Sequence, residues 1–156
     1  MIRRLDHIAI AVPDLDAAIR RFAEDIGIPL AGREDVPTEL TSTAFFPIEG
    51  TRIELVQPMA GQGPIAGFLE KKGPGLHHVC FESDDLDADI ARLRAKGYQF
   101  LSEGPKPGAH GSRVIFIHPR SCGGVLMELA QHPHVGPDAS PDASGDTDGD
   151  TDGAAS

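Results

Sequence analysis

Aromatic and basic residues are scarce in this chain of 156 residues, which has no tryptophan, one tyrosine and 5% aromatic residues. A nucleic-acid reader that stacks bases on aromatic side chains is therefore not expected. The 14 Lys and Arg stand against 24 Asp and Glu, which gives a net charge of −10. This balance disfavours binding to a phosphate backbone or to an anionic membrane surface.

Cysteines, long apolar runs and nucleotide-binding motifs are also lacking. The two cysteines, Cys80 and Cys122, are too few for a disulfide scaffold. No run approaches the roughly 18 apolar residues of a membrane span, and the first residues have no long apolar segment typical of a secretory signal. No GxGxxG or Walker loop is present. We therefore expect a cytoplasmic protein without a membrane partner, in which both cysteines are reduced.

The acidity is concentrated at the C-terminal end. Residues 133–156 contain six Asp and no Lys or Arg, so residues 1–132 carry a net charge of only −4. The terminal segment is rich in Pro, Asp, Ser and Gly and poor in large apolar side chains. Such a composition cannot bury enough surface to offset chain entropy. We expect a folded domain over 1–132 and a disordered acidic tail over 133–156.

The folded part contains an internal repeat. Residues 5–19 (LDHIAIAVPDLDAAI) match residues 76–90 (LHHVCFESDDLDADI) at a shift of 71. A second match, at a shift of 74, aligns 50–55 (GTRIEL) with 124–129 (GVLMEL). Two copies with a period longer than that of solenoid units predict a duplicated module.

Each copy predicts the element order βαβββ. Alternating apolar residues predict a first strand over 5–12 and 76–82, and a helix follows over about 14–26 and 85–96. The remaining strands are expected over about 29–35, 41–48, 51–57, 99–103, 112–118 and 124–131. A helix over about 63–72 links module one, about 5–58, to module two, about 75–131. The fold class is therefore α+β.

Two histidines and two glutamates occupy corresponding positions of the modules: His7, Glu54, His78 and Glu128. A carboxylate in an apolar strand is costly to bury unless it is paired, protonated or bound to a metal. A single such residue would be an ordinary structural one, but four at symmetric positions favour a shared divalent metal site. The residues do not distinguish cobalt, nickel, manganese, iron and zinc.

Other histidines are weaker ligand candidates. His77 is a rival to His78, but the repeat aligns His78 with His7. His132 and His134 stand at the start of the acidic tail and are expected to be solvated. Cys80 is expected to be a small packed residue and Cys122 a turn residue.

Four segments carry a resemblance to a known family: DHIAIAVPDLDAAI (6–19), GTRIELVQP (50–58), PIAGFLEKKGPGLHHVCFE (64–82) and GAHGSRVIFIHPRSCGGVLMELAQ (108–131). Together they resemble the methylmalonyl-CoA epimerase family of the vicinal oxygen chelate superfamily. The resemblance implies that the two modules form a curved mixed sheet around a metal held by His7, Glu54, His78 and Glu128. It also implies an acyl-CoA substrate and a homodimer.

The implied reaction interconverts (2R)- and (2S)-methylmalonyl-CoA. The α-hydrogen is too weakly acidic for a free side-chain base, and a metal bound by the substrate oxygens would stabilise the enolate. Glu128 is the candidate for one acid/base. Some family members carry a second catalytic Glu where this chain has Thr43, so Glu39 and a metal-bound water stay open as alternatives. Lys106, Arg113 and Arg120 are candidates to meet the CoA phosphates or are solvated surface charges.

Two other functions stay open at this point. One is another metal-dependent enzyme of the superfamily, such as a glyoxalase-like lyase or an epimerase of a related acyl-CoA, for example ethylmalonyl-CoA. The other is a non-enzymatic small-molecule binding protein, as in drug-sequestering members of the superfamily. Because those binding proteins typically lack the metal ligands, metal binding separates the two classes.

Overall fold

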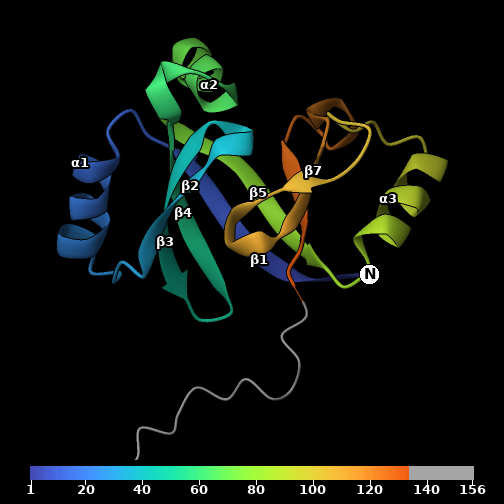
Figure 1. Ribbon diagram of the computed structural model, residues 1–156, viewed down its shortest axis with the longest axis horizontal. Coiled ribbons are helices and arrows are strands. Elements are labelled where there is room, and N and C mark those ends of the chain that lie inside the picture. The colour runs from blue at the N-terminus through green and yellow to red at the C-terminus, as the bar shows by residue number, and fades with distance from the viewer. Residues whose placement is uncertain (134–156) are drawn as a thin grey trace, which may run out of the picture.

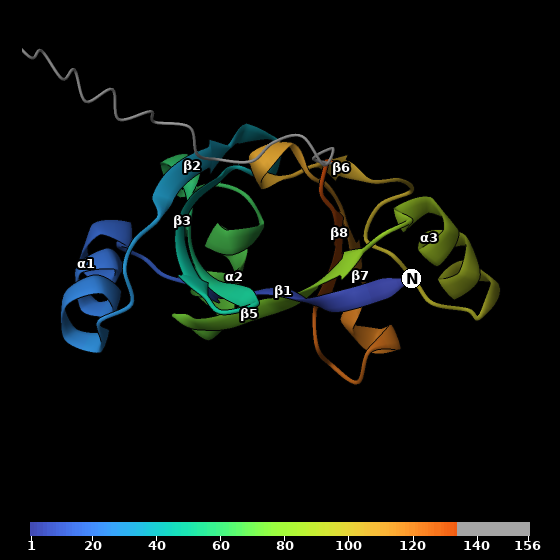
Figure 2. The same ribbon diagram turned by 90° about the horizontal axis from the view of Figure 1, so that it is seen from below.

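A single curled sheet of eight strands organises the computed structural model, which describes residues 1–133. The strand order is β2-β3-β4-β1-β5-β8-β7-β6. Seen from one end, the sheet forms a half-barrel with β1 and β5 along its base, β3 on one side and β8 on the other (Figure 2). This architecture confirms the predicted α+β fold with a curved mixed sheet.

The element order repeats once along the chain (Figure 1). The first module comprises β1 (Ile2–Ala11), α1 (Leu15–Arg20), β2 (Gly32–Val36), β3 (Thr41–Ile48) and β4 (Thr51–Pro58). The second comprises β5 (Gly75–Ser83), α3 (Leu86–Ala95), β6 (Lys106–Pro107), β7 (Arg113–Ile117) and β8 (Met127–Gln131). Helix α2 (Pro64–Lys72) links them, close to its predicted bounds.

The pairing of the strands has the symmetry of the sequence repeat. β1 runs parallel to β4, β5 runs parallel to β8, and the two modules meet where β1 and β5 pair antiparallel. In that central pair His7 stands opposite Cys80 and Ala9 stands opposite His78. Since residues two apart share a face of a strand, both histidines point to the same side of the sheet.

Helices α1 and α3 cover the outer face of the sheet, whereas α2 lies on the concave side (Figure 2). Asp14 and Asp85 cap α1 and α3, each accepting a hydrogen bond from a backbone N–H three residues on, at 2.9 and 3.0 Å. Each helix packs on the strands of its own module through a separate apolar cluster. Helix α2 instead places Ile65 against Ala9, Ala11 and Val56. Among the described residues, no helix is long and apolar enough to cross a membrane.

One predicted strand is wrong. Residues 99–103 form only a single bridge, Phe100 to Ile117, and the edge of the second module is the short strand β6 instead. Phe100 packs with the apolar cluster under α3, and the chain then bends before Lys106. Packing of one aromatic side chain therefore replaces the strand pairing that the alternation predicted. The predicted tail over 133–156 lies almost wholly outside the described residues.

Candidate metal centre and substrate cavity

The concave face of the sheet holds a cavity of about 320 Å³ whose lining comes from both modules. All four residues of the predicted metal set line it, and each is 5–6% exposed. The strand register explains why they meet: Glu54 stands beside Ala9, and Glu128 stands beside Cys80. Small neighbours, both fully buried, leave room for the larger ligand side chains on this face.

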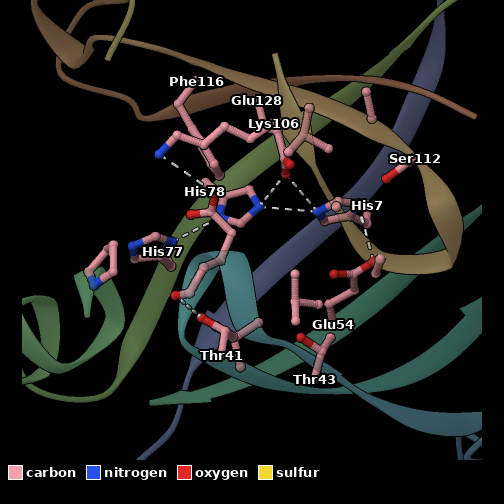
Figure 3. Close-up of a pocket in the computed structure, with 18 of the residues that line it drawn as sticks. His7, Thr41, Thr43, Glu54, His77, His78, Lys106, Ser112, Phe116 and Glu128 are labelled. Atoms are coloured by element: carbon pink, nitrogen blue, oxygen red, sulfur yellow. Dashed lines mark hydrogen bonds and ion pairs between the residues drawn. The ribbon is translucent and has the colours of Figure 1, made fainter. Parts of the chain in front are cut away.

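Three of the four predicted ligands converge at one point (Figure 3). His7 Nε2 and His78 Nε2 are 3.1 Å apart. Glu128 Oε2 lies 2.8 Å from the same atom of His78 and 3.2 Å from that of His7. Atoms bound to one ion at about 2.1 Å stand about 3 Å apart when they are at right angles. Two imidazole nitrogens and one carboxylate oxygen at these separations therefore fit a divalent transition ion.

Glu54 stands apart from this group of three. Its Oε1 accepts a hydrogen bond from Arg52 Nε at 2.7 Å and lies 3.3 Å from His7 Nδ1, the ring nitrogen that faces away from His78. Arg52 breaks the symmetry of the repeat, because the corresponding position of the second module holds Leu126. The assignment of Glu54 as a fourth ligand stays a prediction.

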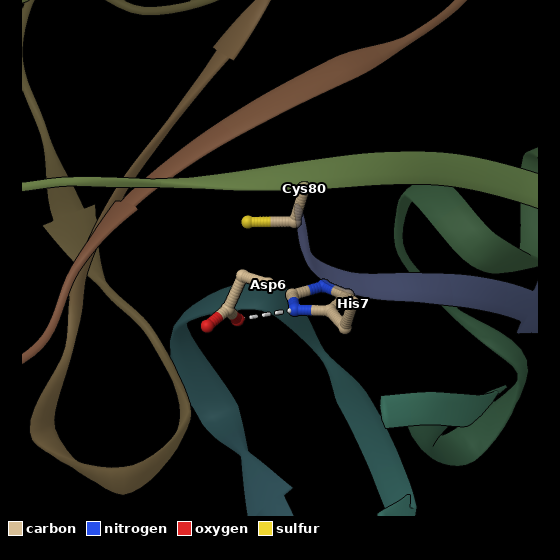
Figure 4. A group of neighbouring side chains, drawn as sticks. All are labelled: Asp6, His7 and Cys80. Carbon is tan, nitrogen blue, oxygen red and sulfur yellow. Dashed lines mark hydrogen bonds and ion pairs between the residues drawn. The ribbon is translucent and has the colours of Figure 1, made fainter. Parts of the chain in front are cut away.

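Asp6 supports His7 from behind (Figure 4). A bulge in β1, where residues 5–7 oppose only Cys80 and Phe81, turns the side chain of Asp6 to the side of His7. Asp6 Oδ2 accepts a hydrogen bond from His7 Nδ1 at 2.8 Å, which leaves Nε2 as the ligand atom. Metal-binding histidines commonly have such a carboxylate partner.

Arg52 and His132 contact Asp6 in turn. Arg52 Nη2 lies 2.8 Å from Oδ2, and His132 Nε2 donates to Oδ1 at 2.8 Å. Burial alone would raise the pKa of Asp6, but hydrogen bonds from His132 and His7 and the charge of Arg52 hold it well below its usual range. The prediction that His132 is solvated is wrong, because this side chain is 25% exposed and is bound to Asp6. His134 lies outside the described residues.

The electrostatics of the centre favour the protonated form of His7 and the ionised form of Glu128. Burial acts to lower the pKa of His7, but hydrogen bonds to Asp6 and Glu128 raise it to about 9. Burial acts to raise the pKa of Glu128, but His78 and His7 hold it below its usual value. Glu128 is therefore a carboxylate near neutral pH, the form that accepts a proton or binds a cation.

His77 and Cys80 stand beside the centre. His77 Nδ1 lies 2.8 Å from His78 Nδ1, so the two rings share a hydrogen bond on the side away from Glu128. Burial, together with the charge of His78, lowers the pKa of His77 to about 4. Cys80 is fully buried beside Asp6 and His7, and burial raises the pKa of its thiol well above its usual value. The thiol is therefore protonated, and the residue is packed as predicted.

Glu39, Thr43 and Lys106 line the mouth and walls of the cavity. Thr43 is 3% exposed. Burial raises the pKa of Glu39 above its usual value, and the nearest cation, Lys106 Nζ, is 4.0 Å from Glu39 Oε1. Arg113, one of the predicted phosphate contacts, is not part of the cavity lining and instead pairs with Asp87 at 2.9 Å.

Sequence reasoning missed Asp6, Arg52 and His132. The available signal is a charged residue next to a predicted ligand in an apolar strand: Asp6 precedes His7, and Arg52 stands two residues before Glu54. For His132 no comparable signal exists, because its partner Asp6 is 126 positions away in the chain.

Fold and site define the class of this protein. The chain belongs to the Glyoxalase/Bleomycin resistance protein/Dioxygenase superfamily, whose family model matches residues 6–116. Within the superfamily, its relatives include methylmalonyl-CoA epimerases, as the resemblance in the sequence predicted. It is 44% identical to the mitochondrial methylmalonyl-CoA epimerase of Homo sapiens over 129 residues, which are 82% of this chain and 73% of that protein.

Two further comparisons cover nearly the whole of the related chain. The ethylmalonyl-CoA/methylmalonyl-CoA epimerase of Cereibacter sphaeroides is 44% identical over 84% of this chain and 99% of its own length. The structure of a Streptomyces coelicolor methylmalonyl-CoA epimerase variant in complex with 2-nitronate-propionyl-CoA has a TM-score of 0.82. That comparison has 34% identity and covers 86% of this chain and 100% of the other.

Proposed function

We propose that this chain is a metal-dependent epimerase that interconverts (2R)- and (2S)-methylmalonyl-CoA. The observation that carries the proposal is a cavity in which His7, His78 and Glu128 converge. It occurs in a chain that is 44% identical to epimerases named for this substrate. A non-enzymatic binding protein does not need buried imidazole and carboxylate groups in contact, because their desolvation is costly without a ligand to compensate.

The residues of the centre have distinct roles in metal binding, positioning and proton transfer. His7, His78 and Glu128 would hold the ion, with Glu54 as the fourth ligand. The bound ion supplies Lewis-acid stabilisation of negative charge on oxygen. Asp6 fixes the tautomer and the ring orientation of His7 through the hydrogen bond at Nδ1. Glu128 accepts the α-proton as a carboxylate in one direction of the reaction and delivers a proton as the carboxylic acid in the other.

Exchange of the α-hydrogen with solvent tests this function. Each epimer of methylmalonyl-CoA is incubated in deuterium oxide with the protein, to which cobalt, nickel, manganese or zinc has been added in turn. We expect deuterium at C2 and conversion of either epimer into the other. If no metal-loaded form of the protein gave exchange, the epimerase proposal would be wrong.

Metal content separates the enzyme from the binding module without a substrate. Elemental analysis of the purified protein and calorimetric titration with each ion are expected to show one divalent ion per chain. A folded protein without affinity for any of these ions would favour the binding module. The identity of the ion, assembly as a homodimer and a cytoplasmic location stay predictions. Calorimetric titration measures which ion binds, and sedimentation measures whether the protein is a homodimer.

Ethylmalonyl-CoA is the second candidate substrate. The relative from Cereibacter sphaeroides carries both substrates in its name, and the alignment spans 99% of that protein. One extra methylene in an apolar pocket changes discrimination by only about 10–200-fold. The ratio of kcat/KM values for the two thioesters, measured side by side, decides which one this chain prefers.

A further inference from the structure

Epimerisation sets a geometric demand that one acid/base does not meet. Removing and returning a proton on the same face of the α-carbon restores the original configuration. A second group must therefore stand on the opposite face and deliver or accept the other proton. Given the proposed function, Glu128 serves one face, and Thr43 offers only a hydroxyl group, which is not a useful base near neutral pH.

Glu39 enters the same cavity from module one and carries its carboxylate to within 4.0 Å of Lys106 in module two. It ends a short 3-10 turn, Pro37–Glu39, that follows β2 in module one, whereas Glu128 lies on β8 in module two. Figure 2 shows β2 and β8 on opposite sides of the half-barrel. Both carboxylates line the cavity, and Glu128 is near enough to act on the pKa of Glu39. A substrate enolate bound in this cavity would therefore lie among carboxylates that enter it from different modules.

One oxygen of the Glu39 carboxylate lacks a hydrogen-bond partner within the described residues, so a bound ligand can supply one. This oxygen is Glu39 Oε1, which is buried and has no hydrogen-bond partner among residues 1–133. The nearest cation, Lys106 Nζ, is 4.0 Å away, beyond hydrogen-bond distance. A buried, unpaired carboxylate oxygen is costly, and it is retained where a group from outside completes it.

The backbone around Glu39 is held in a strained conformation. The next residue, Leu40, has φ = 51°, in the left-handed region that a leucine rarely adopts. Thr41 Oγ1 donates a hydrogen bond to the Glu39 carbonyl at 2.9 Å, and Leu40 Cβ packs tightly against Gly63. A side chain at position 63 would meet Leu40 at 2.9 Å. Strain of this kind persists where the surrounding structure over-determines the turn, as at functional sites.

From this geometry we infer that Glu39 is the second acid/base of the epimerase. In one direction Glu128 takes the α-proton, and the C–H bonding electrons pass into the thioester as the enolate forms. Glu39 then delivers its proton to the opposite face, a new C–H bond forms, and Glu39 becomes a carboxylate. The reverse direction exchanges the two roles. Each carboxyl group returns to its starting state by proton exchange with water, so no other reactant is needed.

The test separates exchange from inversion in the full-length, metal-loaded protein. The variants are Glu39→Gln, which keeps the size of the side chain, and Glu49→Gln, a matched control in the exposed turn between β3 and β4. Each pure epimer is incubated in deuterium oxide, and deuterium at C2 and configuration are followed together. Inversion by Glu39→Gln is expected to fall about 10²–10⁴-fold.

Exchange without inversion is the specific signature. In Glu39→Gln, the epimer that presents its α-hydrogen to Glu128 still takes up deuterium at the wild-type rate but keeps its configuration. The other epimer neither exchanges nor inverts, and Glu49→Gln behaves as wild type. A merely structural role would slow the exchange of both epimers equally, and that result would overturn the inference, as would normal inversion by Glu39→Gln. If the wild-type protein exchanges neither epimer, the proposed function itself fails.

Discussion

The two modules share one fold but place their histidines in different surroundings. His7 has a carboxylate behind it, Asp6, and an arginine nearby, Arg52. At the corresponding positions of module two, His78 has His77 and Leu126. The pKa of His7 is raised to about 9, whereas burial lowers the pKa of His77 to about 4. A duplicated backbone thus supplies symmetric ligand positions, and a few neighbouring residues give the two histidines different partners.

The glutamates are expected to show the largest difference between the halves. Glu128→Gln removes the carboxylate that meets both histidines, so turnover is expected to fall by about 10²–10⁴-fold or more, with the fold retained. Glu54→Gln keeps an oxygen ligand and is expected to cost much less. Steady-state kinetics of the two variants, with circular dichroism as the folding control, makes the comparison. Near-normal activity of Glu128→Gln would remove this residue as the base.

Giving module one the residue of module two is expected to destabilise the protein. Arg52→Leu leaves the buried carboxylates of Asp6 and Glu54 without their shared cation. Breaking a buried ion pair by removing one partner costs about 3–5 kcal/mol in the free energy of unfolding. Urea denaturation measures the loss, and Leu126→Met is the matched control in the other half. Equal stability of both variants would show that the Arg52 network contributes nothing.

The hydrogen-bond partner of His7 is expected to affect metal affinity more than that of His78. Asp6→Asn weakens the acceptor at His7 Nδ1, and loss of such a partner typically lowers metal affinity about 10–100-fold. His77→Asn changes a partner that carries no negative charge and is expected to have a smaller effect. Calorimetric titration with one metal gives both dissociation constants. Equal effects of the two variants would contradict the asymmetry.

The smallest expected effect is a pH dependence of metal binding. Because His7 has a raised pKa without metal, an ion must displace its proton, and affinity is expected to rise with pH up to about 9. In the metal-free protein the sign is opposite. The stabilisation from protonated His7 is complete below its unfolded pKa of about 6.5 and is lost as the pH rises through about 9. Asp6→Asn is expected to weaken the pH dependence of both metal affinity and stability. A variant with the wild-type profiles would argue against Asp6 as the cause of the raised pKa of His7.

The repeat in the sequence predicted the fold well because it shows the order of the helices and strands and which side chains share a face of the sheet. Matching the two copies placed His7, His78, Glu54 and Glu128 on the concave face, and the strand register agrees with that placement. The repeat failed where packing differs between the copies. Residues 99–103 alternate like a strand, but Phe100 belongs to the core under α3, and the edge strand forms at Lys106–Pro107 instead.

The sequence by itself determined the duplicated module and which four side chains share a face, because the alternation of a strand and the period of the repeat are local properties of the chain. Only the tertiary structure decided how those side chains are partnered. Three features depend on segments brought together across the half-barrel. They are the bulge that turns Asp6 inward, the contact of His132 with Asp6, and the buried oxygen of Glu39 that has no partner within residues 1–133. Hydrogen bonding and desolvation act over a few ångströms in space, and distance along the chain does not reveal them.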